Sequence, residues 1–251
     1  MIVKPIKTRI FKEGENLFNF IIHYIKKLPE KSVLVVTSKI AALAEDRTAI
    51  IENEKTKEKL IRAESEFAMK TKYTWLTIKD GMVMSSAGID ESNANGKIIL
   101  LPKDSFKTAA ILRKQLQKKY KIKNLGVLIT DSRLMPLRAG VTGVALGYAG
   151  FHGIKSYIGT PDIFGRKLHF SRTDVADSLA TAAVLVMGEG KEQHPLAIIE
   201  KSPIKFCEKV NRRELRIDIR EDMYMPLFSK MPKQKGRRKL LNLRLLPCVI
   251  L

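Results

Sequence analysis

Three acidic residues stand where the sequence predicts that a strand or a helix has just ended. Asp90 follows the alternating stretch GMVMSS, Asp131 ends the apolar run VLIT, and Glu189 comes just after a long stretch rich in small residues. Acids that converge from distant segments in this way build oxygen-ligand sites for Mg²⁺ or Mn²⁺. An isolated acid at a strand end is more often a turn-former, so spacing alone leaves both interpretations open.

Several common site motifs are absent from the sequence. It contains neither a G-x-x-x-x-G-K-[ST] phosphate loop nor a G-x-G-x-x-G motif after a predicted strand. It also lacks a G-x-S-x-G elbow and an H-E-x-x-H pair, which argues against hydrolase and metalloprotease functions. The four histidines are scattered without metal-ligand spacing. A nucleotide site in this chain would therefore be of an uncommon type.

The composition is that of a soluble globular protein. Of 251 residues, 45% are apolar and 29% are charged, enough to bury a core in one large domain or two small ones. No apolar run reaches the roughly 18 to 20 residues of a membrane helix, and residues 1–14 are too charged for a signal peptide. The two cysteines, Cys207 and Cys248, suggest a reducing compartment without a disulfide framework. We therefore expect a cytoplasmic protein with no membrane partner.

The chain is strongly basic. Its 46 Lys and Arg against 26 Asp and Glu give a formal charge of +20, which attracts polyanions such as nucleic acid or nucleotide phosphates. Basic runs lie at 112–124 and at 230–244. No RNA-binding aromatic signature or zinc-finger spacing accompanies them. We therefore favour a solvated basic face and a basic tail over a nucleic-acid site.

The first half of the chain alternates predicted helices and strands. Apolar residues at helical spacing predict a helix within 14–28, and the helix formers of 54–70 predict a second one. The β-branched run 32–38 predicts a buried strand. Residues 73–78 and 81–86 predict two strands of a hairpin that turns at Lys79-Asp80-Gly81.

The second half has sharper helix boundaries. A helix over 104–120 is expected to begin at a cap formed by Asp104 or Ser105, and one within 173–190 at Thr173 or Asp174, with its end at Gly188. Strands are expected at 125–132 and 195–200. The glycine-rich stretch 139–150 suits close approach of the backbone to a ligand or a neighbouring strand. The pattern weakens after residue 202.

Several of these segments, in this order, resemble the coenzyme F420-0:γ-glutamyl ligase family. They are PIKTRIFKEGENL, VLVVTSKIAALAEDR, SSAGIDESNANGKIILLP, VLITDS, GVTGVALGYAGFHGIKSYIGTPDIFGRKL and VADSLATAAVLVMGEG. The resemblance covers about residues 3 to 200. It implies an α/β fold of the α+β type, with mixed, largely antiparallel sheets and flanking helices. We therefore expect a catalytic domain over 1–228 and a basic C-terminal tail over 229–251.

The resemblance also implies an activity. The family joins L-glutamate to a carboxylate acceptor through a γ-glutamyl amide bond, with GTP as co-substrate and Mg²⁺ or Mn²⁺ as cofactor. An acceptor carboxylate must become an acyl phosphate before an amine can attack it, and hard cations held by Asp and Glu suit that crowded charge. Relatives act on coenzyme F420-0 or on folates, and both acceptors stay open here. The resemblance further implies a homodimer.

Site residues are carried over from the family motifs position by position. Asp90 and Asp131 become the catalytic acids, and the metal ligands are Asp90, Asp131, Ser132 and Glu189. The glycines and Ser132 could equally serve in turns and packing. The nucleotide-binding residues implied by the resemblance are Thr8, Arg9, Ile10, Phe11, Ser38, Lys39, Asn93, Met187, Gly188, Gly190 and Lys191.

The chain departs from the family pattern around these residues. Where relatives carry SKAEGR, this chain has ALAEDR with Leu43 and Asp46, so a cation is missing unless Lys39 or Arg47 replaces it. The region GRxxR becomes RLMPLR, which keeps Arg138 and offers Arg133, and Ser86 stands where asparagine is frequent. These changes leave the metal and nucleotide chemistry in place and bear on the identity of the acceptor. The departure at Leu43, with the charge of +20, motivates an alternative function, a catalytically altered relative that binds nucleotide or nucleic acid through its basic surface. Retention of all three acids argues against it.

The last four residues, CVIL, follow a polybasic stretch and match a prenylation box. A four-residue match arises easily by chance. We therefore favour a packed or frayed tail.

Overall fold

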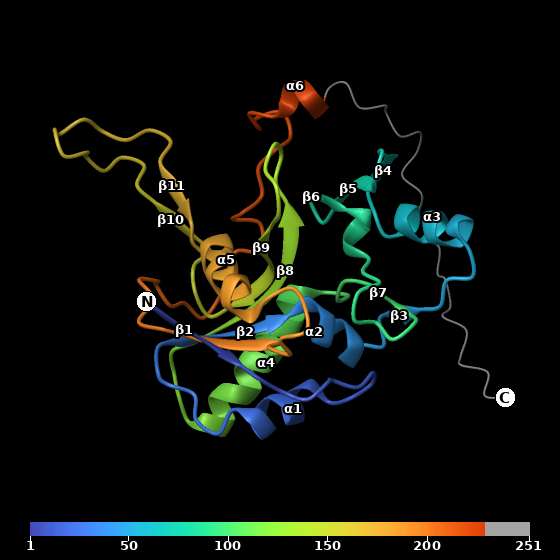
Figure 1. Ribbon diagram of the computed structural model, residues 1–251. Helices are drawn as coiled ribbons and strands as arrows, with labels where there is room; N and C mark the ends of the chain where they lie inside the picture. Colours follow the sequence, from blue (N-terminus) through green and yellow to red (C-terminus); the bar gives the residue numbers. More distant parts are fainter. Residues whose placement is uncertain (229–251) are drawn as a thin grey trace.

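The core of the protein is a five-stranded sheet in the order β1-β12-β2-β8-β9 (Figure 1). The computed structural model describes residues 1–228, so the predicted tail 229–251, with Cys248 and CVIL, lies outside the described residues. Only β2 and β8 pair in parallel, and the other three pairings are antiparallel, which confirms the predicted mixed, largely antiparallel architecture. The strands are β1 (Ile2–Ile6), β12 (Leu196–Glu200), β2 (Ser32–Thr37), β8 (Leu125–Leu134) and β9 (Val141–Ala149).

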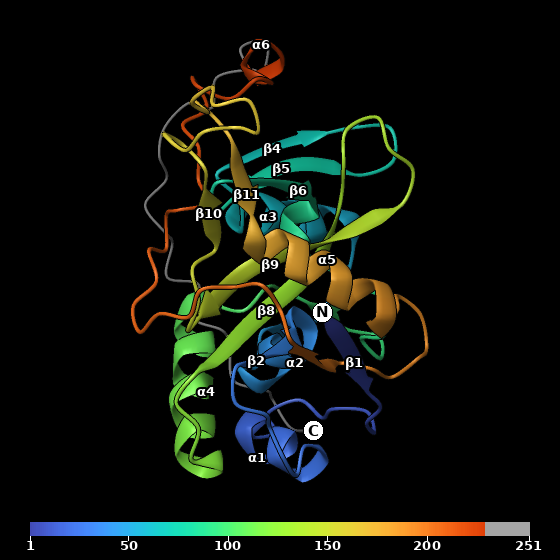
Figure 2. The same ribbon diagram turned by 90° about the vertical axis from the view of Figure 1, so that its left-hand side faces the viewer.

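Helices cover both faces of this sheet (Figure 2). On β2, Leu34 and Val36 face one hydrophobic cluster, whereas Val33 and Val35 face the other. A strand buried on both faces is apolar along its whole length, which explains the run SVLVV. The first cluster contains α1 (Leu17–Tyr24), α2 (Ser38–Ala44) and α4 (Ser105–Tyr120), and the second contains α5 (Val175–Met187).

The predicted helix boundaries are confirmed at three positions. The Asp104 side chain accepts a hydrogen bond from the Lys107 amide at 2.9 Å, and α4 begins just after it. Asp174 caps α5 in the same way through the Asp177 amide at 2.9 Å. Gly188 ends α5 at φ 82°, a conformation that favours glycine. These boundaries fix where the chain leaves α5 toward Glu189.

The single helix predicted over 54–70 is wrong in its second half. The helix α3 (Glu54–Ala63) ends, and β4 (Phe67–Lys70) pairs with β5 (Trp75–Lys79), which pairs with β6 (Met82–Ser85). Strand pairing and the burial of Ala68 override the helix propensity of this stretch. The predicted hairpin is confirmed, with Asp80 and Gly81 at φ 53° and 75°, as a two-residue turn requires.

In the glycine-rich stretch 139–150, two glycines of β9 lie against helix backbone, whereas Gly150 lies against the neighbouring strand β8, as predicted, since a Cβ there would lie 2.1 Å from the Leu125 carbonyl oxygen. A Cβ on Gly143 would lie 2.4 Å from the Ala180 carbonyl oxygen of α5, and one on Gly147 would lie 2.4 Å from the Phe106 amide of α4. Since real Cβ atoms do not approach so closely, these positions need glycine.

Several elements were not predicted. β1 carries Pro5 in an edge position, which tolerates proline, and α2 has only seven residues after β2. None of the helices in residues 1–228 is long and apolar enough to cross a membrane. The remaining elements are β3 (Thr48–Ala49), the 3₁₀ turn η1 (Ser86–Gly88), β7 (Ile98–Ile99), β10 (Ile154–Ser156), β11 (Arg172–Asp174) and α6 (Met225–Phe228).

Candidate functional site

The predicted site residues meet beside the carboxyl ends of the parallel strands β2 and β8. In the ladder, Thr37 is paired with Thr130, so Ser38 and Asp131 follow side by side. Ligands of α/β proteins bind at such strand ends. The strand pairing thus places α2 next to Asp131, although about ninety residues separate them in the chain.

The loop after η1 adds Asp90 to this position. The Lys39 ammonium lies 2.8 Å from Oδ2 of Asp90 and also donates to the Ser92 carbonyl oxygen at 3.0 Å. Oδ1 of Asp90 accepts from the Ser92 amide at 2.6 Å, so the carboxylate is fixed from both sides. Backbone bonds between Asp90 and Ile99 of β7 anchor the loop. We name Lys39, Asp90 and Asp131 the acid–lysine cluster.

The two acids of the acid–lysine cluster have opposite electrostatic character. Burial raises the pKa of Asp131 to about 6, and the Asp90 carboxylate adds to this, against the Ser132 amide, Lys39 and the Ser38 hydroxyl. Burial also raises the pKa of Asp90, but the bonds from Lys39 and Ser92 outweigh it and hold that pKa below its usual value. Lys39 forms an ion pair with Asp90, so with Asp131 close by the cluster has more negative than positive charge, which favours a cation.

A second group of predicted residues lies at the end of α5. The Ser132 hydroxyl donates to Oε2 of Glu189 at 3.3 Å. The side-chain amide of Asn93 donates to the Gly190 carbonyl oxygen at 3.4 Å. Segment 188–190 therefore contacts both the loop of Asp90 and strand β8. Within residues 1–228, however, no three His, Cys, Asp or Glu side chains are grouped closely enough to hold a metal ion by themselves.

The predicted nucleotide-binding residues near the N-terminus, 8–11, lie against the segment that follows α5. The Thr8 amide donates to the Gln193 carbonyl oxygen at 3.0 Å, which brings residues 8–11 next to 187–193. The Arg9 side chain is paired with Glu15, and Ile10 is exposed. The Phe11 and Met187 side chains are buried in the two hydrophobic clusters, whereas Gly188, Gly190 and Lys191 are exposed.

The alternatives left open around Leu43 have different positions in the fold. Lys39 belongs to the acid–lysine cluster, but Arg47 pairs with Glu64 at 2.8 Å and donates to the Leu101 carbonyl oxygen. Lys39 is thus the cation at the site. Glu91 pairs with Lys57 at 2.7 Å, away from Asp90.

Ser92 was not predicted as a site residue, whereas His194 ends the segment 187–194 that the resemblance places along the nucleotide. Ser92 binds both Lys39 and Asp90, and its position between Asp90 and Asn93 was the available signal. Nδ1 of His194 is buried and has no hydrogen-bond partner among the described residues. His194 precedes Pro195, whose carbonyl oxygen accepts from the Thr37 amide at the end of β2. No local pattern distinguishes this histidine from the other three.

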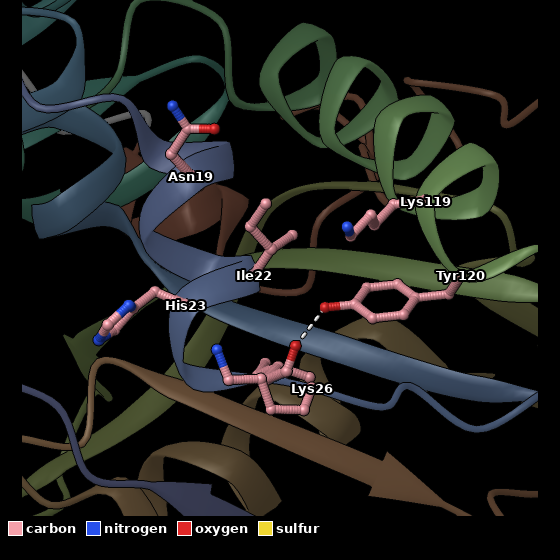
Figure 3. A pocket seen from close by; sticks show the side chains of 7 residues that line it. Asn19, Ile22, His23, Lys26, Lys119 and Tyr120 are labelled. Atoms are coloured by element: carbon pink, nitrogen blue, oxygen red, sulfur yellow. Dashed lines mark hydrogen bonds between the residues drawn. The ribbon is translucent and has the colours of Figure 1, made fainter.

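Two of the cavities on the described surface are relevant to the position of the site. One, of about 250 Å³, is lined by Asp131, Ser132 and Arg133 together with apolar residues. The other, of about 470 Å³, lies between α1 and α4, where the Tyr120 hydroxyl donates to the Ile25 carbonyl oxygen (Figure 3). The second cavity contains no predicted site residue, so the first one belongs to the candidate site.

Comparison with known proteins identifies the family of the chain. A family model described as F420-0:Gamma-glutamyl ligase matches residues 5–201. The coenzyme F420:L-glutamate ligase of Methanococcus maripaludis strain C7 is 39% identical over 138 residues, 55% of each chain, so the match spans little more than half of that relative. The ligases of Methanosarcina mazei and Archaeoglobus fulgidus are 30% and 31% identical over 220 and 208 residues, which is 80% and 76% of this chain and 85% and 83% of theirs. The chain therefore belongs to the F420-0:γ-glutamyl ligase family.

Proposed function

We propose that the protein is a nucleotide- and divalent-metal-dependent ligase that forms a γ-glutamyl amide bond between L-glutamate and a carboxylate of coenzyme F420-0 or a folate. The observation that carries this proposal is the acid–lysine cluster: Lys39, Asp90 and Asp131 meet beside β2 and β8 with Asp90 and Lys39 only 2.8 Å apart. Family membership and the names of the relatives support the same activity. We place the reaction in the cytoplasm.

The donor set fits a hard divalent cation. Asp90, Asp131, Ser132 and Glu189 supply only oxygen atoms, the ligands that Mg²⁺ and Mn²⁺ prefer. Mg²⁺ usually takes one or two protein carboxylates and completes its shell with water and substrate phosphates, so a preformed group of three acids is not needed. When bound, the metal neutralises phosphate charge while the acceptor carboxylate is activated. Burial, together with the nearby Asp90 carboxylate, raises the pKa of Asp131, and a bound cation would stabilise its charged form.

The chain's own groups orient the substrates. We infer that the Lys39 ammonium, released from Asp90, attracts a phosphate of GTP, and that Asn93 and the exposed backbone of 188–190 bind the same nucleotide. GTP transfers its terminal phosphoryl group to the acceptor carboxylate. The amino group of glutamate then attacks the acyl phosphate and releases inorganic phosphate.

We further propose a homodimer that uses the arm formed by β10, β11 and residues 157–171. This arm projects from the sheet in Figure 1, and Ile163, Phe164 and Phe170 on it are 92%, 89% and 91% exposed. Large apolar side chains gathered on an exposed arm are a feature of protein interfaces. Loss of the dimer in Phe164→Asp, measured by light scattering, would support this, and an unchanged mass would contradict it.

The activity is tested with purified protein, Mn²⁺, GTP and L-glutamate, mixed with F420-0 or tetrahydrofolate in separate reactions. We expect the acceptor to gain the mass of one glutamate and GDP to appear in equal amount. Omission of Mn²⁺ and addition of EDTA serve as controls. If neither acceptor gains mass and no GDP is released, the ligase proposal is wrong. Binding of GTP without any product would instead favour the alternative of a catalytically altered binding protein.

A further inference from the structure

The cavity of about 250 Å³ beside Asp131 has a wall that the metal and the nucleotide do not require. It lies where the small sheet of β4, β5 and β6 meets the ends of β8 and β9. Its apolar lining comes from Met82, Met84, Leu134, Val144 and Leu146. Such junctions between subdomains are common binding positions for small molecules. A wall of this kind next to charged groups suits a ligand with an apolar part and an acidic part.

The apolar wall is preformed but adaptable. Met82 and Met84 are two residues apart on β6 and therefore point to the same face of the strand. Both pack against the small hydrophobic cluster of Leu101, Val144 and Leu146. Unbranched thioether side chains adjust to irregular shapes and make favourable contacts with aromatic rings. This wall therefore suits a flat, ring-bearing group.

The polar end of the cavity carries an arginine with unused hydrogen-bonding capacity. Nη2 of Arg133 donates to Oδ2 of Asp177 at 3.2 Å, and Oδ1 of Asp177 accepts from the Ala145 amide at 2.9 Å. Arg133 is thus oriented by a carboxylate that is itself fixed to β9. Its Nε is buried and has no hydrogen-bond partner among residues 1–228. The Arg133 side chain lines the cavity and is 27% exposed, so an anionic ligand can accept charge-assisted hydrogen bonds from the accessible part of the guanidinium.

We propose that this cavity binds the acceptor, with its ring-bearing part against Met82 and Met84 and its carboxylate held by Arg133. The inference rests on the proposed ligase function and adds the acceptor's position to it. Arg133 lies two residues from Asp131 on β8, roughly 7 Å along a strand, so a carboxylate at Arg133 is within reach of a phosphate at Asp131. The cavity has room for part of an acceptor, and the remainder extends into solvent.

A matched pair of leucine variants tests the apolar wall. Leu134 lines the cavity and is 54% exposed, so Leu134→Trp narrows the cavity without overfilling the core. Leu137, in the connection that follows β8, is fully exposed and does not line the cavity, so Leu137→Trp is the control. We expect Leu134→Trp to raise KM for F420-0 or tetrahydrofolate about tenfold or more and to leave KM for GTP and glutamate unchanged. Leu137→Trp should change none of them.

A second pair of variants tests the anion-binding end. Arg133→Gln should raise the KM for the acceptor about 100-fold. Arg133→Lys should raise this KM less, because lysine keeps the positive charge but cannot form the bidentate pair of an arginine. Thermal melting of each variant checks that the fold survives. If the wild-type protein is active and the acceptor KM is unchanged in Leu134→Trp and Arg133→Gln, this inference is wrong and the ligase function stands. Wild-type protein that adds glutamate to neither acceptor would overturn both.

Discussion

Two charged clusters of this protein contain the same kinds of side chain but differ in balance. In the acid–lysine cluster the ammonium of Lys39 pairs with the carboxylate of Asp90, and the carboxylate of Asp131 lies close enough to interact electrostatically with both. The second cluster, which we name the Glu64 cluster, joins the carboxylate of Glu64 to Arg47 at 2.8 Å and to Lys79 at 2.6 Å. The acid–lysine cluster therefore has a formal excess of negative charge, whereas the Glu64 cluster has a formal excess of positive charge.

The two clusters also differ in how completely their groups are bonded. In the Glu64 cluster, Arg47 additionally donates to the Leu101 carbonyl oxygen and Lys79 to the Glu64 carbonyl oxygen, and all three side chains are at most 19% exposed. In the acid–lysine cluster, the Asp90 side chain is 43% exposed. A closed, saturated cluster joins elements of the fold, whereas an open cluster with surplus negative charge can accept a cation. Substitutions in the two clusters should therefore affect different properties.

The largest expected effect is on catalysis, from Asp131→Asn. We expect glutamate ligation to fall by about 1,000-fold, since metal ions contribute several kcal/mol and each 1.4 kcal/mol, roughly, is tenfold in rate. The fold should persist because the amide is nearly isosteric and removes a charge that burial disfavours. Product mass and thermal melting measure the two properties. Asp80→Asn, at the exposed hairpin turn, is the charge-matched control, and full activity in Asp131→Asn would remove the metal assignment.

The next effect is on stability, from Glu64→Gln. This change leaves Arg47 and Lys79 partly buried without their carboxylate, and we expect a loss of about 2 to 3 kcal/mol in the free energy of unfolding. Activity per folded molecule should not change. Glu58→Gln breaks the exposed Arg62 pair on α3 and should cost only about 0.3 to 0.5 kcal/mol. Equal losses in the two variants, measured by urea unfolding, would show that the Glu64 cluster has no special role.

The two clusters should respond to pH with opposite signs. Burial raises the pKa of Glu64, but Lys79 and Arg47 outweigh it and hold the pKa below 4.5, so the stability that Glu64 contributes is present above pH 4.5 and is lost as pH falls through its folded pKa. The pKa of Asp131 is raised to about 6, so its contribution is favourable below pH 3.8 and is lost as pH rises through 6.

We therefore expect Asp131→Asn, with EDTA present, to be more stable than wild type by about 1 kcal/mol at pH 8 and to lose that advantage near pH 4. Glu64→Gln should show its full deficit at pH 7 and a smaller one at pH 3.5. Unfolding free energies across this range measure both effects. Parallel pH profiles for the two variants would contradict the contrast between the clusters.

The difference between the clusters also marks the limit of prediction from sequence. Caps and turns were predictable because they depend on neighbouring residues, as at Asp104, Asp174 and the Asp80-Gly81 turn. The meeting of Lys39 with Asp90 and Asp131 depends on the parallel pairing of β2 and β8, which no spacing in the chain specifies. The site residues accordingly came from the family resemblance rather than from periodicity.

Ser86 shows how a departure from a family pattern acquires a physical meaning. It stands where relatives frequently have asparagine, and its φ is 48°, in the left-handed region where asparagine is the favoured non-glycine residue. Its hydroxyl lies 3.0 Å from the Thr74 hydroxyl in the neighbouring hairpin. The position is therefore explained by backbone conformation, and it carries less weight for the identity of the acceptor than the sequence suggested.

The smallest expected effect comes from Ser132→Ala, at the edge of the acid–lysine cluster. The Ser132 hydroxyl is a neutral donor atom bonded to Glu189 at 3.3 Å, so its loss should raise the Mn²⁺ concentration for half-maximal activity by about tenfold. Ser178→Ala removes a hydroxyl from the exposed side of α5 and is the control.

The double variant Ser132→Ala with Glu189→Gln decides between two roles of this pair. If both residues hold one ion, the double variant should lose less Mn²⁺ affinity than the two single losses together, because the sites are coupled. Additive losses would mean that the two residues contribute to Mn²⁺ affinity independently. An unchanged Mn²⁺ requirement in the double variant would mean that neither residue holds the ion, and the metal site would then reduce to Asp90 and Asp131.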